Sequence, residues 1–299
     1  MKEIKIIQRF FSKSNQPGDD CYFRDNYLYT TDTMAEGTHF RLEWSSPADL
    51  AHKLIHVNIS DIGSSGGNPL FCFLNLGLSQ KTSEEHWIEE FSEEFKKILK
   101  YYQIELAGGD TYFSEKTNLS MTVVGECSKL IPRGGGSSGE FIYITGSLGL
   151  SSLGLKALQS PDFAKKIPSE LLSKAMKKHL RPTSRLKEFA NIFQKYPITA
   201  AIDITDGLVQ DAEKLSRASK IGLNINVGHI PEIKNLFPYL SMEEILVSGE
   251  ELEVLFLSPV EITHNLARKI GFTTKEKKIS YLFDGRVISI KEIGYEHFV

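Results

Sequence analysis

Six aspartates lie in short phrases that place a carboxylate beside glycine, threonine or another acid. The phrases are GDD at 18–20, TTDT at 30–33, SDIG at 60–63, GGDT at 108–111 and DITDG at 203–207. The aspartates are Asp20, Asp32, Asp61, Asp110, Asp203 and Asp206. Taken singly, such an aspartate often closes an Asx-turn or caps a helix. As a set, we expect each at a junction between a strand or helix and a loop.

The chemistry that such a set could perform depends on cations. Like charges within a few Å raise each other's pKa, so convergent carboxylates do not all stay ionised without positive charge nearby. Clusters of oxygen ligands suit Mg²⁺, which keeps several waters and shares phosphate oxygens with a few carboxylates. ATP would bring further negative charge, and charge balance would then require several Mg²⁺ ions. The pattern therefore predicts metal-assisted phosphoryl transfer.

Several other classes of protein are excluded or disfavoured. The sequence has no GxxxxGK[ST] and no HRD loop with DFG, which excludes a P-loop enzyme and a protein kinase. A net charge of −3 without a dense basic run disfavours nucleic acid as a partner. No apolar run is long enough to span a membrane, and the first residues do not resemble a signal peptide. Three widely spaced cysteines favour a reducing compartment, so we expect a cytoplasmic protein.

Strand-like and helix-like segments alternate along the chain and must position the acids. Strands are expected at 26–33, 70–79, 119–127, 141–146, 199–204, 223–227, 252–257 and 279–290. Helices are expected from Ser46 as N-cap, over 83–102, 147–159, 168–180 and 183–195, and after Asp206. The apolar and aromatic residues of 83–102 repeat at three-and-four spacing, which favours core packing over a cofactor site. Loops at one edge of an α/β sheet converge, and we expect the acids there.

The Gly- and Ser-rich phrase PRGGGSSGE at 132–140 is the best candidate for a domain boundary. A chain of 299 residues favours two domains over one. We therefore expect domains at 1–131 and 132–299.

These phrases together resemble the thiamine-monophosphate kinase family. The resemblance rests on GDD, TTDTMAEGTHF, KLIHVNISDIGSSGGNP, LAGGDT, VVGE, PRGG, IYITGSLGLSSLGL, HLRPTSR, AIDITDGL, SGEELEVLF and GYEHF, in this order over nearly the whole chain. It implies the two-domain α/β (α+β) fold of the aminoimidazole ribonucleotide synthetase superfamily, with mixed sheets flanked by helices. It also implies ATP-dependent phosphorylation of thiamine monophosphate to thiamine diphosphate by direct in-line transfer with several Mg²⁺ ions. The implied assembly is a homodimer formed through the N-terminal domain, which would also bind ATP and magnesium.

The resemblance assigns roles to individual residues. Metal ions or their waters would be held by Asp20, Thr30, Thr31, Asp32, Asp61, Asp110 and Asp203, with a further magnesium at Asp206. Of these, Asp32, Asp61 and Asp206 are expected to be catalytic. ATP would contact Tyr101, Gly109, Arg133 and Thr205. Thiamine monophosphate would face His39, Glu250 and Tyr295, although His39 could also be a core histidine and Tyr295 a packing residue.

The sequence departs from the family at two places. SGEELEVLF at 248–256 stands where GGEDYEL is usual, so Glu251 and Leu252 replace an Asp-Tyr pair, and GGGSSGE replaces a Ser-Gly-Ala turn. The altered 248–256 loop leaves open a catalytically idle protein that binds a nucleotide or a thiamine phosphate, although retention of all six acids argues against it. Another ATP-dependent enzyme of the superfamily is a second alternative, disfavoured by EGTHF and by the lack of a reactive N-terminal cysteine phrase and of a C-terminal cysteine tail. Arg181 and Arg185 are expected to form ion pairs at helix ends, outside the site.

Overall fold

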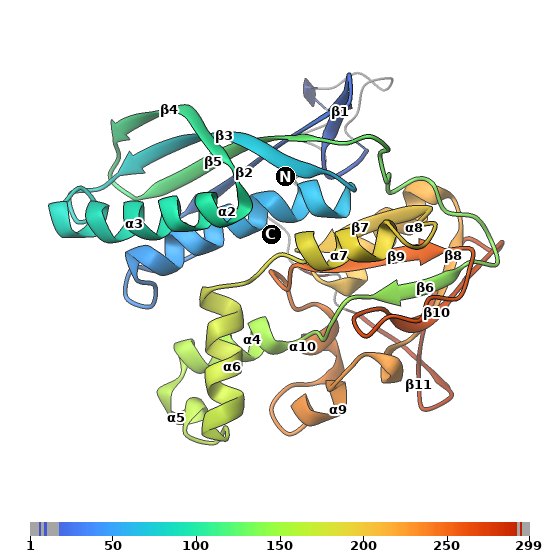
Figure 1. Ribbon diagram of the computed structural model, residues 1–299. Helices are drawn as coiled ribbons and strands as arrows, with labels where there is room; N and C mark the ends of the chain where they lie inside the picture. The colour runs from blue at the N-terminus through green and yellow to red at the C-terminus, as the bar shows by residue number, and fades with distance from the viewer. Residues whose placement is uncertain (1–5, 7–8, 11–17, 292–293, 295–299) are drawn as a thin grey trace.

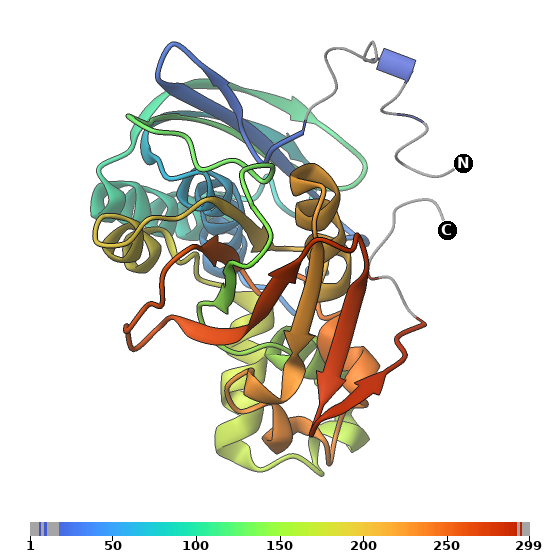
Figure 2. The same cartoon turned by 90° about the vertical axis from the view of Figure 1, so that its right-hand side faces the viewer.

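Two mixed β-sheets, one from each half of the chain, organise the fold (Figure 1). The computed structural model describes residues 6, 9–10, 18–291 and 294. In Figure 2, the orange to red strands of the second sheet lie below the blue-green first sheet. The expected α/β class with mixed sheets flanked by helices is confirmed. Within the described residues, none of the helices has the length and hydropathy needed to cross a bilayer.

The first sheet has one covered face and one open face. Its strands are, in spatial order, β1 (Tyr22–Arg24), β2 (Tyr27–Ala35), β5 (Asn118–Glu126), β3 (Asn68–Leu78) and β4 (Glu105–Phe113), and only β3 and β4 are parallel. Side chains alternate between faces along β2, so Leu28 and Met34 are buried while Tyr27 and Tyr29 are exposed. Among the described residues, no helix covers the second face, which we call the open face.

Helix α2 (Pro47–Ser64) packs against the covered face and is the central helix of the molecule. Ser46 is the N-cap, as expected, and it forms a capping box with Asp49 at the start of the helix. On its other side α2 contacts elements of the second half of the chain, namely α6, α7 and β7. A helix enclosed in this way buries side chains around its whole circumference, including the polar residues Lys53 and Asn58.

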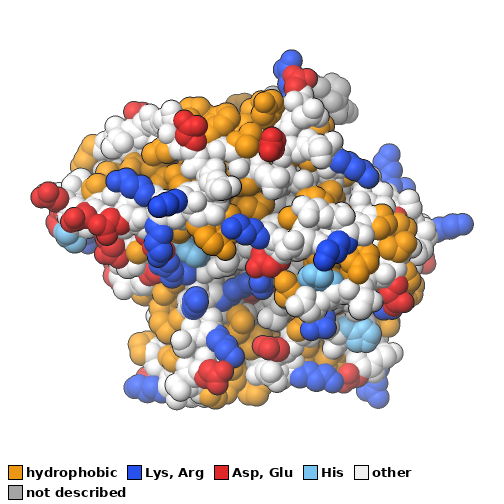
Figure 3. Space-filling model, viewed as in Figure 1, with side chains coloured by type: hydrophobic (Ala, Val, Ile, Leu, Met, Phe, Trp, Pro, Cys, Tyr) orange, Lys and Arg blue, Asp and Glu red, His pale blue; other side chains and the backbone are white. Residues whose placement is uncertain are grey.

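Helix α3 (Glu85–Tyr102) lies beside α2 and buries the aromatic stripe that the sequence predicts. Trp87, Phe91 and Phe95 are buried and their rings stack in sequence, with centroids 5.1 and 5.8 Å apart. Acidic side chains gather over the α3 end of the molecule at the left of Figure 3. Core packing is therefore the role of this stripe.

The second sheet is larger and almost entirely antiparallel. Its order is β12 (Arg286–Ile288), β11 (Ile279–Phe283), β8 (Gly222–Asn226), β10 (Arg268–Thr274), β6 (Phe141–Ile144), β9 (Glu253–Ser258) and β7 (Ala200–Ile204), with only β8 and β11 parallel. The helical elements of this half are α4 (Leu150–Gln159), α5 (Pro161–Ala164), α6 (Ser169–Leu180), α7 (Leu186–Phe193), α8 (Leu208–Ser219), η1 (Val227–His229), α9 (Ile233–Leu236) and α10 (Met242–Leu246). The segment 132–140 runs between the two sheets.

Three expectations about strands are wrong. The segment 279–290 is a hairpin of β11 and β12, because Asp284 and Gly285 take left-handed backbone angles and turn the chain. Strand β10 has no counterpart among the expected elements. Strand β4 contains GGDT, which the sequence analysis places at a junction. The strand requires glycine at position 109, because β3 comes so close that a Cβ there would lie 1.7 Å from the carbonyl oxygen of Leu74.

Candidate active site

Carboxylates from both halves of the chain meet beside the C-terminal end of α2. Asp20 precedes β1, Asp61 lies in the last turn of α2, and Asp203 lies in β7. One oxygen atom from each of the three lies within 4.8 Å of the others. The central position of α2, in contact with both sheets, allows these distant segments to meet.

Mutual repulsion and burial shift the acidity of this cluster. Burial, together with Asp203, Asp32 and Asp20, raises the pKa of Asp61 well above its usual value. The pKa of Asp203 is raised by burial and by Asp20. Burial, Asp20 and Asp206 raise the pKa of Asp32 to about 6. Each of these five carboxylates therefore lies close enough to repel at least one of the others, and a bound cation would relieve the repulsion.

The donor set fits Mg²⁺. The Oδ2 atom of Asp203 is buried and makes no hydrogen bond, and such an uncompensated carboxylate oxygen is costly without a cation. Thr30 adds a hydroxyl that donates to Asp61 Oδ2 over 2.5 Å. Asp20, Asp61 and Asp203 together offer oxygen ligands only, which is the chemistry that Mg²⁺ prefers.

Two cations of the protein itself reach the edges of the cluster. Arg133 forms an ion pair with Asp20, and its backbone N–H donates to Asp19 over 2.6 Å. Lys214 lies 2.6 Å from Asp206 Oδ2 and 2.7 Å from Asp211 Oδ1. Sequence reasoning missed Lys214 and Asp211, because both read as ordinary polar positions of an amphipathic helix.

Asp211 also fixes the backbone that carries Asp206. Its Oδ2 accepts the N–H groups of Thr205 and Asp206 over 3.0 and 3.1 Å. Asp211 is fully buried, and burial raises its pKa to about 6 against the opposing effect of Lys214. The buried carboxylate of Asp211 therefore fixes the backbone of the turn at 205–206 through two hydrogen bonds.

The expectation that every acid stands at a junction is wrong for two of them. Asp32 lies inside β2 and Asp110 inside β4, whereas Asp61 lies in the last turn of α2 and Asp203 one residue before the end of β7. Threonine has high strand propensity, so β2 continues through TTDT to Ala35 instead of ending there. The cluster consequently forms between the two sheets and α2, not along one edge of a single sheet.

Thr31 and Asp110 lie away from the cluster. Thr30 and Thr31 project from opposite faces of β2, and Thr31 bonds to Met121 and Thr122 on the open face. Strands β5 and β3 separate β2 from β4, which puts Asp110 about 14 Å from Asp32 at ordinary strand spacing. Asp110 is exposed, as is every residue of β4, and its carboxylate accepts the N–H of Thr111 over 2.9 Å.

Two of the expected substrate residues meet around a buried lysine. Lys53 Nζ lies 2.6 Å from Glu250 Oε2 and donates to the carbonyl oxygen of His39 over 3.1 Å. Only 3% of the Lys53 side chain is exposed. His39 Nδ1 accepts the backbone N–H of Ala35. The sequence held a signal for Lys53, since it occupies the apolar stripe of α2 between Leu50 and Leu54.

The backbone joins this group to the acidic turn. Glu250 has a left-handed conformation, with φ of 55°, and its N–H donates to the carbonyl oxygen of Thr205 over 2.7 Å. Thr205 immediately precedes Asp206. The expected ATP contact and the expected substrate contact are thus neighbours on two loops that hydrogen-bond to each other.

The altered 248–256 loop has a structural explanation. Glu251 is fully buried, and its Oε1 accepts the N–H groups of Gly149 and Ser151 over 2.7 and 3.1 Å. A carboxylate at the start of a helix compensates the unpaired N–H groups there, so Glu251 caps α4. The loop retains an acid in this position for the stability of α4.

Of the remaining expected residues, one lies at the end of α3 and one outside the described chain. Tyr101 is exposed at the end of α3, with the Lys187 ammonium 3.6 Å from its ring centroid. Tyr295 lies outside the described residues. Gly294 packs against Asp206, since a Cβ on it would lie 2.6 Å from the Asp206 carbonyl oxygen. The residue before Tyr295 therefore reaches the acidic turn.

Arg181 and Arg185 form the ion pairs expected of them. Arg181 pairs with Asp49 and Glu94 on α2 and α3, and Arg185 pairs with the buried Glu253. The Arg181 pairs join the two halves of the chain, the Arg185 pair lies within the second half, and all of them lie outside the carboxylate cluster.

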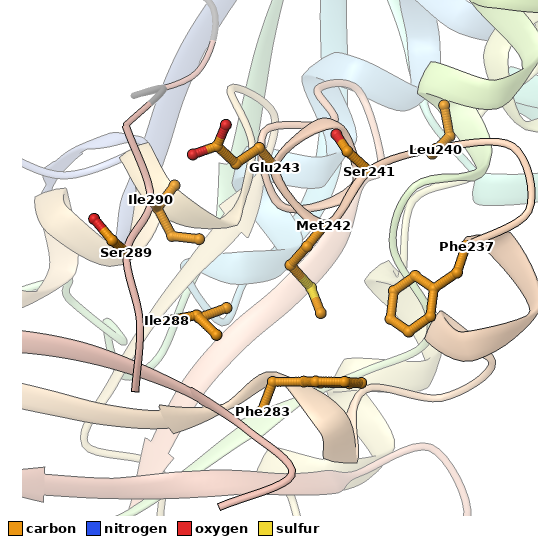
Figure 4. A pocket seen from close by; sticks show the side chains of 9 residues that line it. All are labelled: Phe237, Leu240, Ser241, Met242, Glu243, Phe283, Ile288, Ser289 and Ile290. Atoms are coloured by element: carbon orange, nitrogen blue, oxygen red, sulfur yellow. The ribbon is translucent and has the colours of Figure 1, made fainter. Parts of the chain in front are cut away.

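An apolar pocket of about 440 Å³ lies apart from these residues, in the second half of the chain (Figure 4). Figure 4 shows Phe237, Met242, Phe283 and Ile288 pointing into it, with Glu243 at its rim. None of the expected site residues lines it. Its chemistry does not suit a triphosphate.

Comparison with known proteins agrees with this arrangement. Residues 18–127 match the family described as AIR synthase related protein, N-terminal domain, and residues 137–276 match its C-terminal domain. The thiamine-monophosphate kinase of Leptospira interrogans is 44% identical over 304 residues, covering 100% of this chain and 98% of its own length. That of Aquifex aeolicus is 32% identical over 307 residues, covering 99% and 96%.

A solved structure supports the same grouping. The structure described as AaThiL complexed with AMPPCP and TMP superposes with a TM-score of 0.86 at 30% identity and covers 99% of this chain and 97% of that one. Sequence similarity covers nearly the full length of both the chain and these relatives. The chain therefore belongs to the AIR synthase related family and, within it, to the thiamine-monophosphate kinases.

Proposed function

We propose that this chain phosphorylates thiamine monophosphate to thiamine diphosphate with ATP as the donor. The observation that carries the proposal is the convergence of Asp20, Asp61 and Asp203 in a chain similar throughout to thiamine-monophosphate kinases. The solved relative described as a complex with AMPPCP and TMP supports both substrates.

The acids and their neighbours would hold the ions that this transfer requires. Asp20, Asp61 and Asp203, with Thr30 and Asp32 beside them, are the residues we assign to Mg²⁺. The bound ions would neutralise phosphate charge and keep donor and acceptor in line. The attacking group is a phosphate oxygen that is already anionic near neutral pH, so the protein needs no strong general base. Positioning by the protein then carries most of the rate.

Arg133 and Thr205 are the ATP contacts that the geometry favours. Arg133 sits against Asp20 at the rim of the cluster, and its Nε is a buried donor without a hydrogen-bond partner. A guanidinium offers several N–H groups in a planar fork, which suits a phosphate. Thr205 lies on the turn that carries Asp206, close to the same position.

The thiamine end of the acceptor would lie near Lys53. Glu250 retains 27% exposure of its side chain while Lys53 holds it, so it can accept a hydrogen bond from a ligand. His39 lies on the other side of the same lysine. Tyr295 follows Gly294, which packs on Asp206, and we assign its ring to stacking on the ligand.

We further propose that two copies of the chain share the site. Thr31 and Asp110 are expected metal ligands, yet both lie on the open face or the exposed strand β4. Exposed Tyr27, Tyr29 and Phe73 on that face supply apolar area for a partner. A second copy packed there would bring its own Asp110, and Gly109 beside it, toward this chain's site.

We also propose two domains, 1–131 and 132–299, and activity in the cytoplasm. The three cysteines support a reducing compartment, since all are buried and unpaired. Each of the two proposed domains contains one of the sheets.

The test of the activity is direct. Purified protein with ATP, Mg²⁺ and thiamine monophosphate should yield thiamine diphosphate and ADP in equal amounts. Tight binding of both ligands without product would show an idle binding protein instead. A product formed only from another phosphate acceptor would assign the chain to a different activity.

The shared site has its own test. Asp61→Asn and Asp110→Asn variants should each be inactive, and unfolding and refolding them together should restore about a quarter of wild-type activity. Random pairing would make half of the refolded dimers heterodimers with one copy of each variant. Each heterodimer has one intact site out of two. No recovery in the mixture would show that Asp110 acts within its own chain or not at all.

A further inference from the structure

We propose that the ammonium group of Lys214 is a built-in cation that takes the place of the divalent ion expected at Asp206. This inference rests on the proposed Mg²⁺-dependent kinase activity and concerns how many ions its site takes. It divides the acidic cluster into a side that binds metal and a side that the protein neutralises itself.

The contacts of Asp206 carry the first step. Its Oδ2 lies 2.6 Å from Lys214 Nζ and also accepts a hydrogen bond from Gln210 Nε2 over 3.3 Å. Lys214 and Gln210 both lie on α8, which begins directly after the turn that carries Asp206. One oxygen of this carboxylate is therefore occupied by two donors of the protein.

The second step is that Lys214 is anchored. Its Nζ also contacts Asp211 Oδ1 over 2.7 Å, and Asp211 is fully buried. A lysine that moved away from Asp206 would leave this buried carboxylate without its cation, which is strongly unfavourable. The ammonium is thus held between two carboxylates, unlike a surface lysine that a metal ion could displace.

The rest of the cluster shows the contrast. Among the described residues, no lysine or arginine forms an ion pair with Asp61, Asp32 or Asp203. Asp203 Oδ2 is buried without a hydrogen bond. Arg133 pairs with Asp20 at the edge of this side, but Asp61, Asp32 and Asp203 still need positive charge from outside the protein, whereas Asp206 already has its counter-charge.

The chemistry of the two cations differs in a useful way. An ammonium group has three N–H donors, and Asp206 and Asp211 use two of them. The third is available to a phosphate oxygen without any loss of coordinated water. Lys214 would then support the phosphate directly, and 23% exposure of its side chain leaves it accessible from the site.

Counting bound Mn²⁺ by electron paramagnetic resonance tests the proposal without turnover. The full-length protein is titrated with Mn²⁺ in the presence of a non-hydrolysable ATP analogue. We expect Asp206→Asn to bind as many ions as the wild type, and Lys214→Gln to bind one more. Asp61→Asn is the matched control and should bind at least one fewer.

Two results would overturn the inference: one ion fewer in Asp206→Asn, or no additional ion in a folded Lys214→Gln. Should Lys214→Gln fail to fold, Asp206→Asn and the charge-preserving Lys214→Arg decide, since both should match the wild-type count. If the wild type makes thiamine diphosphate and Asp206→Asn binds one ion fewer than the wild type, only the role of Lys214 is refuted. A wild type that binds no Mn²⁺ at all would refute the metal assignment as well.

Discussion

Replacing Lys53 by methionine tests the proposed thiamine end of the site. Methionine keeps the length of the apolar stem but removes the ammonium that joins Glu250 to the carbonyl oxygen of His39. The substitution should lower both the free energy of unfolding and the affinity for thiamine monophosphate, because one carboxylate and one carbonyl lose their common donor.

The magnitude follows from burial. Removing one partner of a fully buried ion pair costs about 3–5 kcal/mol, and a hydrogen bond to a charged group contributes about 1.5–3 kcal/mol. Lys53 is almost completely buried, but 27% of the Glu250 side chain is exposed, so water can replace part of the lost interaction. We expect a loss of about 2 kcal/mol, which lowers Tm by about 3 °C in a chain of this size.

Kinetics separate positioning from stability. If Lys53 holds Glu250 for the substrate, KM for thiamine monophosphate should rise about tenfold, equivalent to 1.4 kcal/mol, with a smaller change in KM for ATP. Lys174→Met removes an exposed ion pair with Glu170 and is the matched control, with no change expected in either constant. In the double variant with Glu250→Gln the two effects should not add, because the two residues share one interaction.

Unchanged Tm and KM in Lys53→Met would refute this reasoning. Such a result would mean that the ion pair contributes nothing net and that Glu250 does not need it. A lower Tm with normal KM would keep the structural role and remove the one for the substrate.

Three further predictions concern the acids and β4. Asp61→Asn should lower kcat about a hundredfold or more while the metal-free protein keeps its Tm, because one repelling charge is gone; a steady-state assay beside thermal unfolding would decide, and full activity would contradict the metal assignment. In EDTA, the raised pKa of Asp32 contributes stability that is present below pH 3.8, the ordinary pKa of the group, and is lost as the pH rises through about 6. Tm should therefore fall over this pH range, and it should fall less in Asp32→Asn than in the wild type. Parallel curves of Tm against pH for the two proteins would argue against the shift. Gly109→Ala should destabilise the fold by about 4 kcal/mol or more, since its Cβ would meet the Leu74 carbonyl oxygen at 1.7 Å. Gly108→Ala, whose Cβ would meet only the Phe73 ring at 3.4 Å, should change Tm little, and equal Tm values for the two variants would refute the argument.

Local patterns predicted much of the framework. Ser46 as N-cap predicted the start of α2, and the aromatic spacing of 83–102 predicted the buried face of α3. These signals succeed because capping and periodicity depend on neighbours in sequence. Strand β4 was not predicted because its two glycines are typical of a turn. Glycine is required at position 109 because β3, which is distant in sequence, leaves no room for a Cβ there.

For the proposed site, the sequence predicted the acids and Arg133 but not the two lysines. Carboxylates beside glycine and threonine stand out in a sequence, whereas Lys214 looks like an ordinary helical lysine and Lys53 differs from one only by its place in the apolar stripe of α2. Their importance comes from partners on other elements or from burial, which only the folded chain shows. Thr30 and Thr31 give a similar lesson, because adjacent strand residues point to opposite faces and only one can reach Asp61.

Helix α2 also sets a length. Lys53 and Asp61 lie on the same helix, and eight residues of helix rise about 12 Å. Backbone hydrogen bonds hold that interval, so substitutions around either end can weaken a contact without altering the span between them. For a ligand that extends from Lys53 to the acids, α2 fixes the distance between its two ends. Molecules with the same end groups but a different length would then bind less well.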